Sequence, residues 1–310
     1  MNHYVISPRK RFKDIMRRYW VLYALVFPCI VFLIVFRYIP LILQVILAFK
    51  DYKLAEGIWG SRWVGFDNFV QILTAPEISQ VVYNTFYLSL LRLITGFLPP
   101  IILAILLFDL LGHRLKRICQ TIIYIPHFFS WTVVYAVTYA FFSNGGLVNS
   151  LLSKLGLSGR NYLVEENWFL PLLLGSAIWK EIGWNTIIYL AALTSINTEL
   201  YEVAKIDGAG PLKRIQYVTL PGIRNVVIFL LVLSLGNILR GAGMEQILLF
   251  YSPPVFAISD VIDTWVYRMG LSNLEYSLGC AVSFFQSAFG LVTILICNKL
   301  SVKYTKVGLW

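Results

Sequence analysis

The stretch that decides the fold is Ser195–Pro221, which reads SINTELYEVAKIDGAGPLKRIQYVTLP. Its pattern predicts a short helix that starts at Asn197 or Thr198, because both side chains can accept a hydrogen bond from a backbone N–H at a helix start. Glu199 and Glu202 fall in the first turn, where the helix dipole favours acidic groups. An apolar face follows at i, i+3 and i+4, formed by Leu200, Val203 and Ala204.

The second half of this stretch predicts a break and a second short helix. Gly208 and Gly210 are expected to stop the first helix. Pro211 can open the next one, since its missing N–H costs nothing at a first helical position. The dipeptide Leu220-Pro221 is expected to end the second helix before the apolar segment that follows.

Outside this stretch the chain is too apolar for a soluble fold. It has 310 residues, of which 58% are hydrophobic and 14% charged, whereas soluble domains have about 25% charged residues. A bilayer core needs about 20 mostly apolar residues per helix. Six segments qualify: Trp20–Ala48, Thr85–Leu111, Ile118–Phe142, Asn167–Leu193, Ile223–Phe250 and Tyr276–Asn298. We therefore expect an all-α polytopic membrane protein with six transmembrane helices in one domain, residues 20–298.

The net charge of +10 orients this protein rather than indicating nucleic acid. Sixteen of the 26 basic residues fall on one side of the predicted membrane, in the segments 1–19, 112–117, 194–224 and 299–310. Six fall on the other side. The positive-inside rule then predicts that the tails 1–19 and 299–310 are cytoplasmic, together with the loop 195–221.

The loop carries a specific spacing: Glu202-Val203-Ala204, then Gly208, then Val218-Thr219-Leu220-Pro221. It resembles the EAA loop of binding-protein-dependent ABC importer permeases, E-A-A, three residues, Gly, nine residues, I-x-L-P. The longer run Glu199–Ala209 resembles the ELYEAA-x-IDGA form of sugar permeases, with Val203 in place of Ala. Gly65–Phe69 with Asn84-Thr85 is similar to the stretch that enters the second span of maltose and glycerol-phosphate-type permeases. The run Tyr124–Trp131 looks most like members grouped with import of polysaccharide fragments.

The resemblance implies a type I ABC importer permease fold in the bacterial cytoplasmic (inner) membrane. The loop would be a coupling helix seated in a cytoplasmic ATPase, through the residues Glu199, Glu202, Ala204, Asp207, Gly208, Ala209, Pro211, Leu220 and Pro221. The chain itself has no GxxxxGK[ST] loop, so it is expected to be no enzyme and to hold no cofactor, with ATP and Mg on the ATPase. Its partners would be a second homologous permease chain, an ATPase dimer, an extracytoplasmic sugar-binding protein, a carbohydrate and membrane lipid, with no nucleic acid.

Charged residues inside the spans are candidates for the substrate pathway, because charge in mid-membrane is costly and marks function. Lys180 and Glu181 lie near the middle of the fourth span. As sequence neighbours they point to different helix sectors, so they are not expected to neutralise each other. Arg37 and Arg92 lie toward span ends, where snorkelling explains them.

Two stripes add polar and aromatic candidates. The fifth span has Ser234, Asn237, Gly241 and Glu245 at helical spacing, with Arg240 alongside, and the third has Phe128, Trp131, Tyr135, Tyr139 and Phe142. Both stripes also fit helix packing, which is the simpler reading of the aromatic one. The pathway candidates are Trp131, Tyr135, Trp179, Lys180, Glu181, Trp184, Asn237, Arg240 and Glu245. Arg240 and Lys180 would suit uronic-acid-bearing fragments.

The expected function is therefore a permease subunit that imports oligosaccharides from a polysaccharide by alternating access. The alternative is a self-sufficient secondary transporter or channel, but no internal repeat or ring of coupling carboxylates supports it. A membrane-embedded enzyme is a third reading. No metal site is expected, because the three histidines and four cysteines form no close cluster in the sequence.

Overall fold

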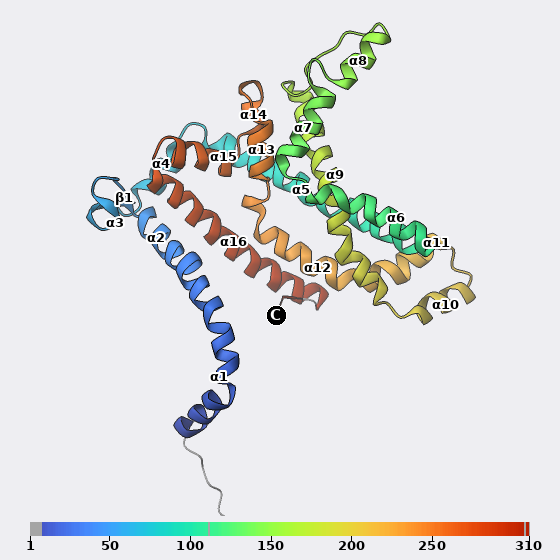
Figure 1. The fold of residues 1–310 in the computed structure, drawn as a ribbon, viewed down its shortest axis with the longest axis horizontal. Coiled ribbons are helices and arrows are strands. Elements are labelled where there is room, and N and C mark those ends of the chain that lie inside the picture. The colour runs from blue at the N-terminus through green and yellow to red at the C-terminus, as the bar shows by residue number, and fades with distance from the viewer. Residues whose placement is uncertain (1–7, 111, 307, 310) are drawn as a thin grey trace, which may run out of the picture.

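The structure is a computed structural model that describes residues 8–110, 112–306 and 308–309, with side chains from residue 17 onward. The chain is almost wholly helical, as predicted (Figure 1). The elements are α1 (Pro8–Leu33), η1 (Ile34–Tyr38), α2 (Ile39–Ala48), β1 (Lys50–Asp51), α3 (Gly57–Gly60), β2 (Arg62–Trp63), α4 (Asp67–Thr74), α5 (Ile78–Asp109), α6 (His113–Tyr124), η2 (Ile125–Phe128), α7 (Trp131–Phe142), α8 (Leu147–Lys154), α9 (Glu166–Thr194), α10 (Thr198–Ile206), α11 (Pro211–Arg214), η3 (Ile215–Thr219), α12 (Leu220–Gly236), η4 (Ile238–Arg240), α13 (Met244–Phe250), η5 (Pro253–Val255), α14 (Phe256–Ser259), α15 (Ile262–Val266), η6 (Tyr267–Ser272) and α16 (Tyr276–Thr305). Among the described residues, the only strands are β1 and β2, an antiparallel pair with Lys50 opposite Trp63.

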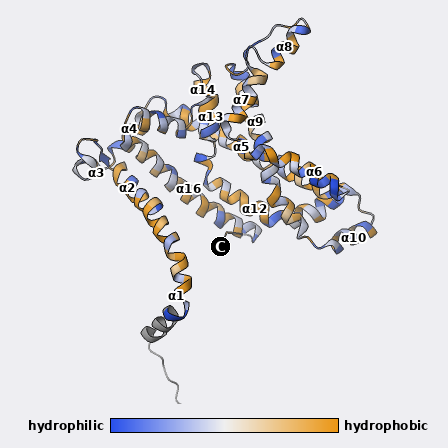
Figure 2. Ribbon diagram, viewed as in Figure 1, coloured by the Kyte–Doolittle hydropathy of each residue, from blue (hydrophilic) through white to orange (hydrophobic). Residues whose placement is uncertain are grey.

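The first predicted span is a helix that leaves the body of the molecule (Figure 1). It runs from Arg17 to Ala48, and its most apolar window contains no buried residue. Hydrophobic residues colour most of its length in Figure 2. Pro40 does not break it, because the π-helical turn η1 lies just before that proline. A π turn shifts the hydrogen-bond pattern where proline would otherwise clash with the carbonyl four residues back.

The helices α5, α9 and α12 pack together around one buried cluster. Ala104 and Ile105 from α5 meet Tyr189 and Leu193 from α9, with Ile223 of α12 beside them. Gly183 of α9 lies so close to α6 that a Cβ there would overlap the carbonyl oxygen of Ile123. These close contacts hold α5, α9 and α12 as the frame of the molecule.

The structure corrects the third predicted span, Ile118–Phe142. The helical pieces His113–Phe128 and Trp131–Lys154 meet at an angle of 101°. Pro126 lies in the 3-10 turn η2, and Ser130 caps the next helix by accepting a hydrogen bond from the backbone N–H of Val133 at 3.3 Å. The segment is therefore a broken span or a re-entrant loop rather than one continuous helix.

The fifth predicted span, Ile223–Phe250, is also discontinuous. The helix α12 ends at Gly236, and Gly243 has a φ of +81°, a left-handed conformation that favours glycine. The α13 helix that follows is a separate element. At the break Gly236 lies against Ile294 and Gly290 of α16, where added side chains would overlap.

Four helices are long and apolar enough to cross a membrane, or five if the bent pair counts as one span, among the residues that the structure describes. The remaining predicted span, α9, has 29 residues but does not pass the same test of apolar character. It carries Lys180 and Glu181 in its middle. The polytopic all-α prediction is thus confirmed, while the number six remains a prediction.

Helices extend into both predicted tails. The α1 helix starts at Pro8 and has non-helical angles at Tyr19, next to the predicted start of the span. The last helix continues to Thr305, beyond the predicted boundary at residue 298. Residues 1–7 of the predicted amino-terminal tail lie outside the described residues.

Candidate functional site

The stretch 195–221 contains the predicted helix α10 with both of its ends capped. The Asn197 side chain accepts a hydrogen bond from the backbone N–H of Glu199 at 3.0 Å, which confirms the predicted cap. At the other end Gly208 has a φ of +72°. The backbone N–H of Ala209 donates to the Ala204 carbonyl at 2.8 Å, and that of Gly208 donates to Lys205 at 3.1 Å. This pair of bonds is the Schellman motif, in which glycine ends a helix in the left-handed conformation.

Tyr201 fixes α10 to the body of the molecule, a role that the sequence analysis did not assign. Its ring lies 5.9 Å from that of Phe108 at the end of α5, and its hydroxyl is 3.1 Å from that of Thr219. Leu200 and Val203 are 54% and 55% exposed. The helix therefore has one anchored side and one free apolar side.

The predicted end of the second helix at Leu220-Pro221 is wrong. Pro211 does open α11, as predicted, but the helix continues without a stop from Pro211 to Gly236. The π-helical turn η3 comes directly before Leu220 and Pro221, as η1 does before Pro40. The stretch 195–221 is thus continuous with a long apolar helix, and α11 is the start of that helix.

The charged pair Lys180–Glu181 forms an ion pair, which corrects the sequence prediction. The Lys180 ammonium lies 3.1 Å from Glu181 Oε1, and Glu181 Oε2 lies 2.8 Å from His127 Nδ1. The long, flexible stems of both side chains curl toward the break at η2, so their different helix sectors do not keep them apart. Lys180 is 6% exposed and also donates to the His127 carbonyl at 2.7 Å. His127 belongs to this charged group through contacts with Lys180 and Glu181, which are 53 and 54 residues away in the sequence, so the sequence did not identify it.

Aromatic rings enclose this charged group. The ring of Trp184 stacks on that of His127 with centroids 4.3 Å apart, and the Lys180 ammonium lies 5.2 Å from the Trp131 ring. Trp184 is 45% exposed, so one face of the stack is open. Trp179 lies against Phe129 instead, at 6.1 Å. Two of the three predicted tryptophans, Trp131 and Trp184, therefore lie against this charged group.

The other candidates separate from this group. Tyr135 packs edge-on against Phe250 at 5.1 Å, within a buried apolar cluster, as the packing interpretation of the aromatic stripe predicts. Glu245 is exposed at the start of α13. Because α12 stops at Gly236, the predicted polar stripe Ser234, Asn237, Gly241 and Glu245 is not one helix face.

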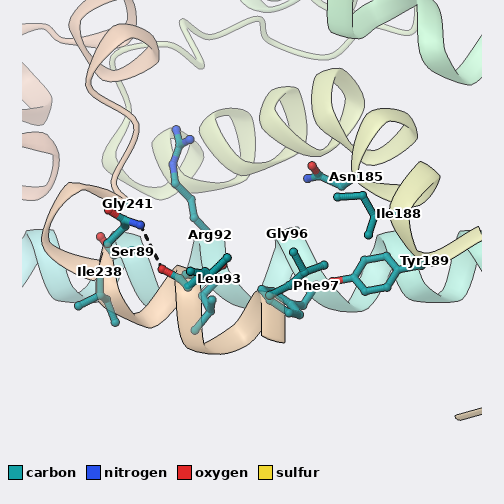
Figure 3. Close-up of a pocket in the computed structure, with 14 residues that line it drawn as sticks. Ser89, Arg92, Leu93, Gly96, Phe97, Asn185, Ile188, Tyr189, Ile238 and Gly241 are labelled. Carbon is teal, nitrogen blue, oxygen red and sulfur yellow. Dashed lines mark hydrogen bonds between the residues drawn. The ribbon is translucent and has the colours of Figure 1, made fainter. Parts of the chain in front are cut away.

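A cavity of about 390 Å³ lies between α5, α9 and the end of α12 (Figure 3). Its lining is part apolar and part polar, and includes Ser89, Arg92, Asn185, Tyr189, Ser234 and Asn237. Known ligand pockets are about 300–1,000 Å³ and combine an apolar wall with a few polar groups. Asn237 is the one predicted pathway residue in this lining.

The two arginines of this region, Arg92 and Arg240, line different hollows. Arg240 lines a second, smaller hollow against α16, where it donates to Ser287 Oγ at 3.0 Å and to the Ser283 carbonyl at 3.3 Å. Arg92 lines the main cavity and donates to the side-chain oxygen of Gln246 on α13. The snorkelling interpretation of Arg92 is therefore wrong, because its guanidinium is held between helices.

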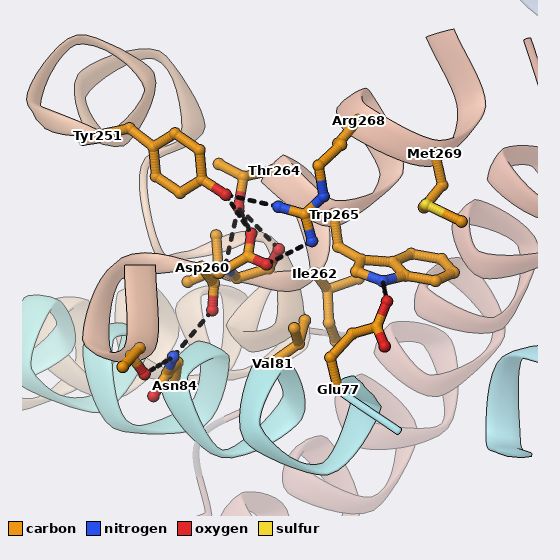
Figure 4. A network of polar contacts seen from close by, with 12 residues as sticks. Glu77, Val81, Asn84, Tyr251, Asp260, Ile262, Thr264, Trp265, Arg268 and Met269 are labelled. Carbon is orange, nitrogen blue, oxygen red and sulfur yellow. Dashed lines mark hydrogen bonds and ion pairs between the residues drawn. The ribbon is translucent and has the colours of Figure 1, made fainter. Parts of the chain in front are cut away.

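A polar network ties the connection between α13 and η6 to the start of α5 (Figure 4). Arg268 forms an ion pair with Asp260 at 2.7 Å and donates to the Tyr251 hydroxyl at 2.5 Å. Burial raises the pKa of Tyr251 to about 12, so its hydroxyl keeps its proton and donates to Asp260. Asn84 of α5 donates to the Asp260 carbonyl at 3.0 Å. The sequence predicts no such network between the fifth and sixth spans, because some of the residues that form it are distant in the chain.

Residues 96–302 match the family described as "Binding-protein-dependent transport system inner membrane component". This match covers the broken helices, the whole of α10 and the part of the cavity lining from Gly96 onward, but not Ser89, Arg92 and Leu93. The chain belongs to this family. It is a transport permease, as the motif in the coupling stretch predicts.

Relatives in this family include two from Bacillus subtilis (strain 168). The polygalacturonan/rhamnogalacturonan transport system permease protein YteP is 38% identical over 97% of this chain and 94% of that protein. Protein LplB is 39% identical over 93% of this chain and 91% of that protein. The chain is also similar to a solved structure, a bacterial alginate ABC transporter in complex with an alginate pentasaccharide-bound periplasmic protein. The TM-score is 0.86 at 39% identity, with 96% of this chain and 99% of that chain covered.

Proposed function

We propose that this permease imports oligosaccharides from an acidic polysaccharide across the cytoplasmic membrane, driven by ATP hydrolysis on a partner ATPase dimer. The α10 helix carries the proposal. It is capped at both ends, anchored on one side by Tyr201, and free on the side of Leu200 and Val203. A free apolar side on a rigid short helix fits a groove in another protein.

The continuity of α11 with α12 gives such a contact a mechanical consequence. A displacement of α11 would pass into the helix that ends beside the cavity, because that helix runs unbroken from Pro211 through η3 to Gly236. ATP-driven movement of the ATPase would then tilt α12 against α5 and α9. This is how the chain would alternate between inward-facing and outward-facing states, together with a second permease chain.

Glu199, Glu202, Asp207, Gly208 and Pro211 are exposed around α10 and are proposed to meet the ATPase. Ala204 and Ala209 are half-buried beneath them and would set the depth of the contact, while Leu220 and Pro221 are exposed where the membrane helix begins. ATP and Mg belong to the ATPase. An external sugar-binding protein would deliver the substrate at the opposite end of the molecule, and both termini would be cytoplasmic.

The substrate class follows from two kinds of support. YteP is named for polygalacturonan and rhamnogalacturonan, and the solved relative for alginate, all of them polymers that carry carboxylates. The cavity offers hydroxyl and amide groups beside apolar walls, which match the hydroxyl groups and C–H faces of a sugar. Asn237 lines this cavity, and Trp184 and the Lys180–Glu181 pair lie on α9, the helix that supplies Asn185, Ile188 and Tyr189 to its lining. Asn237, Trp184 and the Lys180–Glu181 pair are the proposed pathway residues.

Replacement of Gly208 tests the coupling. The variant Gly208→Trp places bulk on the free surface of α10, where nothing lies within 4 Å of the added Cβ. We expect the permease to reach the membrane at its normal level, while uptake of an oligogalacturonide into proteoliposomes of the assembled importer falls at least about tenfold. ATP hydrolysis should no longer respond to the loaded binding protein.

Gly156 gives a matched control. It follows α8 with a φ of +74° and the same Schellman bonds, from Gly156 to Ser153 and from Leu157 to Leu152. The variant Gly156→Trp therefore has the same backbone strain, about 1–2 kcal/mol, but lies far from α10. Uptake should stay within about twofold of the unsubstituted importer. Normal coupled uptake by Gly208→Trp, or uptake that needs no ATPase, would rule out the proposed role.

A further inference from the structure

The charged cluster in the middle of the spans has more positive than negative charge. Arg92 on α5 and Lys180 on α9 are both cations. Glu181 forms an ion pair with Lys180 and, among the described residues, is the one carboxylate that acts electrostatically on Arg92. The oxygens of Glu181 are already engaged, one with Lys180 and the other with His127. The formal charges of Arg92, Lys180 and Glu181 therefore sum to one positive charge. An excess charge at this depth is costly unless an anion or water meets it.

Arg92 is the cation whose bonds are incomplete. One guanidinium nitrogen donates to the Gln246 side chain, which is itself held by the Leu173 carbonyl at 2.7 Å and by Ser176 Oγ at 2.8 Å. The Arg92 Nε is buried and has no hydrogen-bond partner within the described part of the chain. Buried polar groups nearly always have a partner, so the hydrogen-bonding capacity of this guanidinium is only partly used within the protein.

The position of this arginine is built into the fold. Gly243 leaves room for the guanidinium, because a Cβ at that position would overlap it. Arg92 lines the cavity of about 390 Å³ (Figure 3), and the same wall contains Ser89, whose buried hydroxyl also has no partner among the described residues. Arg92 and the unpaired hydroxyl of Ser89 thus lie on the same wall of the cavity.

We propose that Arg92 binds a carboxylate of the transported saccharide and thereby selects acidic over neutral saccharides. This inference rests on the proposed function. A guanidinium matches a carboxylate in shape and can donate two parallel hydrogen bonds to it. The bound anion also cancels the excess charge of the cluster.

The other two cations are less suited to this task. The Lys180 ammonium is buried and is already surrounded by Glu181, the His127 carbonyl and the Trp131 ring. Arg240 faces the hollow beside α16, where Ser287 and the Ser283 carbonyl accept its hydrogen bonds. The sequence pointed to Lys180 and Arg240 for uronic acids, and the contacts favour Arg92.

The test compares two saccharides that differ only in whether each sugar carries a carboxylate or a neutral hydroxymethyl group. The assembled importer, with its ATPase and saturating binding protein, is supplied with trigalacturonate or with its carboxyl-reduced, neutral counterpart. We expect Arg92→Gln to lower the uptake of trigalacturonate at least about tenfold, as expected for a lost charge-assisted hydrogen bond. Uptake of the neutral trisaccharide should change by less than about twofold. Arg92→Lys should recover part of the acidic uptake.

Arg37→Gln is the matched control, since Arg37 lies exposed on η1 in the first span. It should leave both uptakes unchanged. If the binding protein delivers only the acidic trisaccharide, equilibrium dialysis of both trisaccharides against the permease–ATPase complex without binding protein decides instead, with the same expected loss.

An equal loss for both saccharides would show that Arg92 only holds α5 to α13. That result, or unchanged acidic uptake, overturns the inference and leaves the proposed function intact, because ATP-dependent import still occurs. If the unsubstituted importer carries neither saccharide, the proposed function fails as well.

Discussion

At the residue scale, Gly183 decides whether α9 can pack on α6. Its Cα faces the Ile123 backbone, and the carbonyl oxygen there cannot move without a shift of the helix end. We expect Gly183→Ala to destabilise the folded permease by about 1–3 kcal/mol, the usual range for overpacking. Thermal unfolding in detergent measures this as a drop of several degrees. Gly175→Ala, on the same helix with open space around its Cβ, should be neutral or slightly stabilising. Equal stabilities for the two variants would contradict the close approach.

The charged residues Lys180, Glu181 and Arg92 show how much of a site a sequence can reveal. Charge in a span identified Lys180 and Glu181 correctly as residues of interest, because depth in the membrane is a property of the linear sequence. Their mutual ion pair, and the part of His127 in it, depend on the break at η2 that brings a second element within 3 Å. Arg92 was misread for a similar reason, since Gln246 is 154 residues away. Local position predicts which side chains matter, and long-range contacts determine what they do.

At the element scale, the caps of α10 were predictable and the long helices were less so. Asn197 and Gly208 act on bonds within a few residues, so the sequence contains the whole cause. Pro221 predicts a helix end by the same local rule, but a π turn lets the helix continue. The helix α12 ends at Gly236, where α16 packs against it, and this packing is not encoded locally.

The connection between α13 and η6 offers a prediction at this scale. Asp260 accepts hydrogen bonds from Arg268, Thr264 and Tyr251, and its side chain is 12% exposed. Asp260→Asn removes the charge opposite Arg268 and should cost about 1–3 kcal/mol, which thermal unfolding at pH 7–8 would register. Tyr251 does not titrate in that range, because its pKa is about 12. Glu165→Gln breaks a more exposed ion pair, the one between Glu165 and Arg160. The Glu165 side chain is 35% exposed, so this substitution should cost under about 1 kcal/mol. A cost for Asp260→Asn no larger than this would argue against the network as a structural tie.

At the scale of the whole molecule, α9 determines the topology. It has 29 residues and so a length of about 43 Å, more than the roughly 30 Å of a bilayer core. Its charged middle lowers its apolar character, but Lys180 and Glu181 neutralise each other and are enclosed by His127 and α6. We therefore expect α9 to cross the membrane, with the loop before it outside and α10 inside, as the distribution of basic residues requires.

Cysteine labelling tests this arrangement directly. Ser158 lies exposed in the loop before α9, and Lys205 lies exposed on α10 after it. In a variant whose four native cysteines are replaced by serine, Ser158→Cys should react with a membrane-impermeant maleimide on intact cells. Lys205→Cys should react only after the membrane is made permeable, because α9 places the two positions on opposite faces. Labelling of both positions from outside would mean that α9 does not span the bilayer, and α10 could then not meet a cytoplasmic ATPase. Labelling of Lys205→Cys alone would invert the predicted orientation and remove the basis for coupling at Gly208.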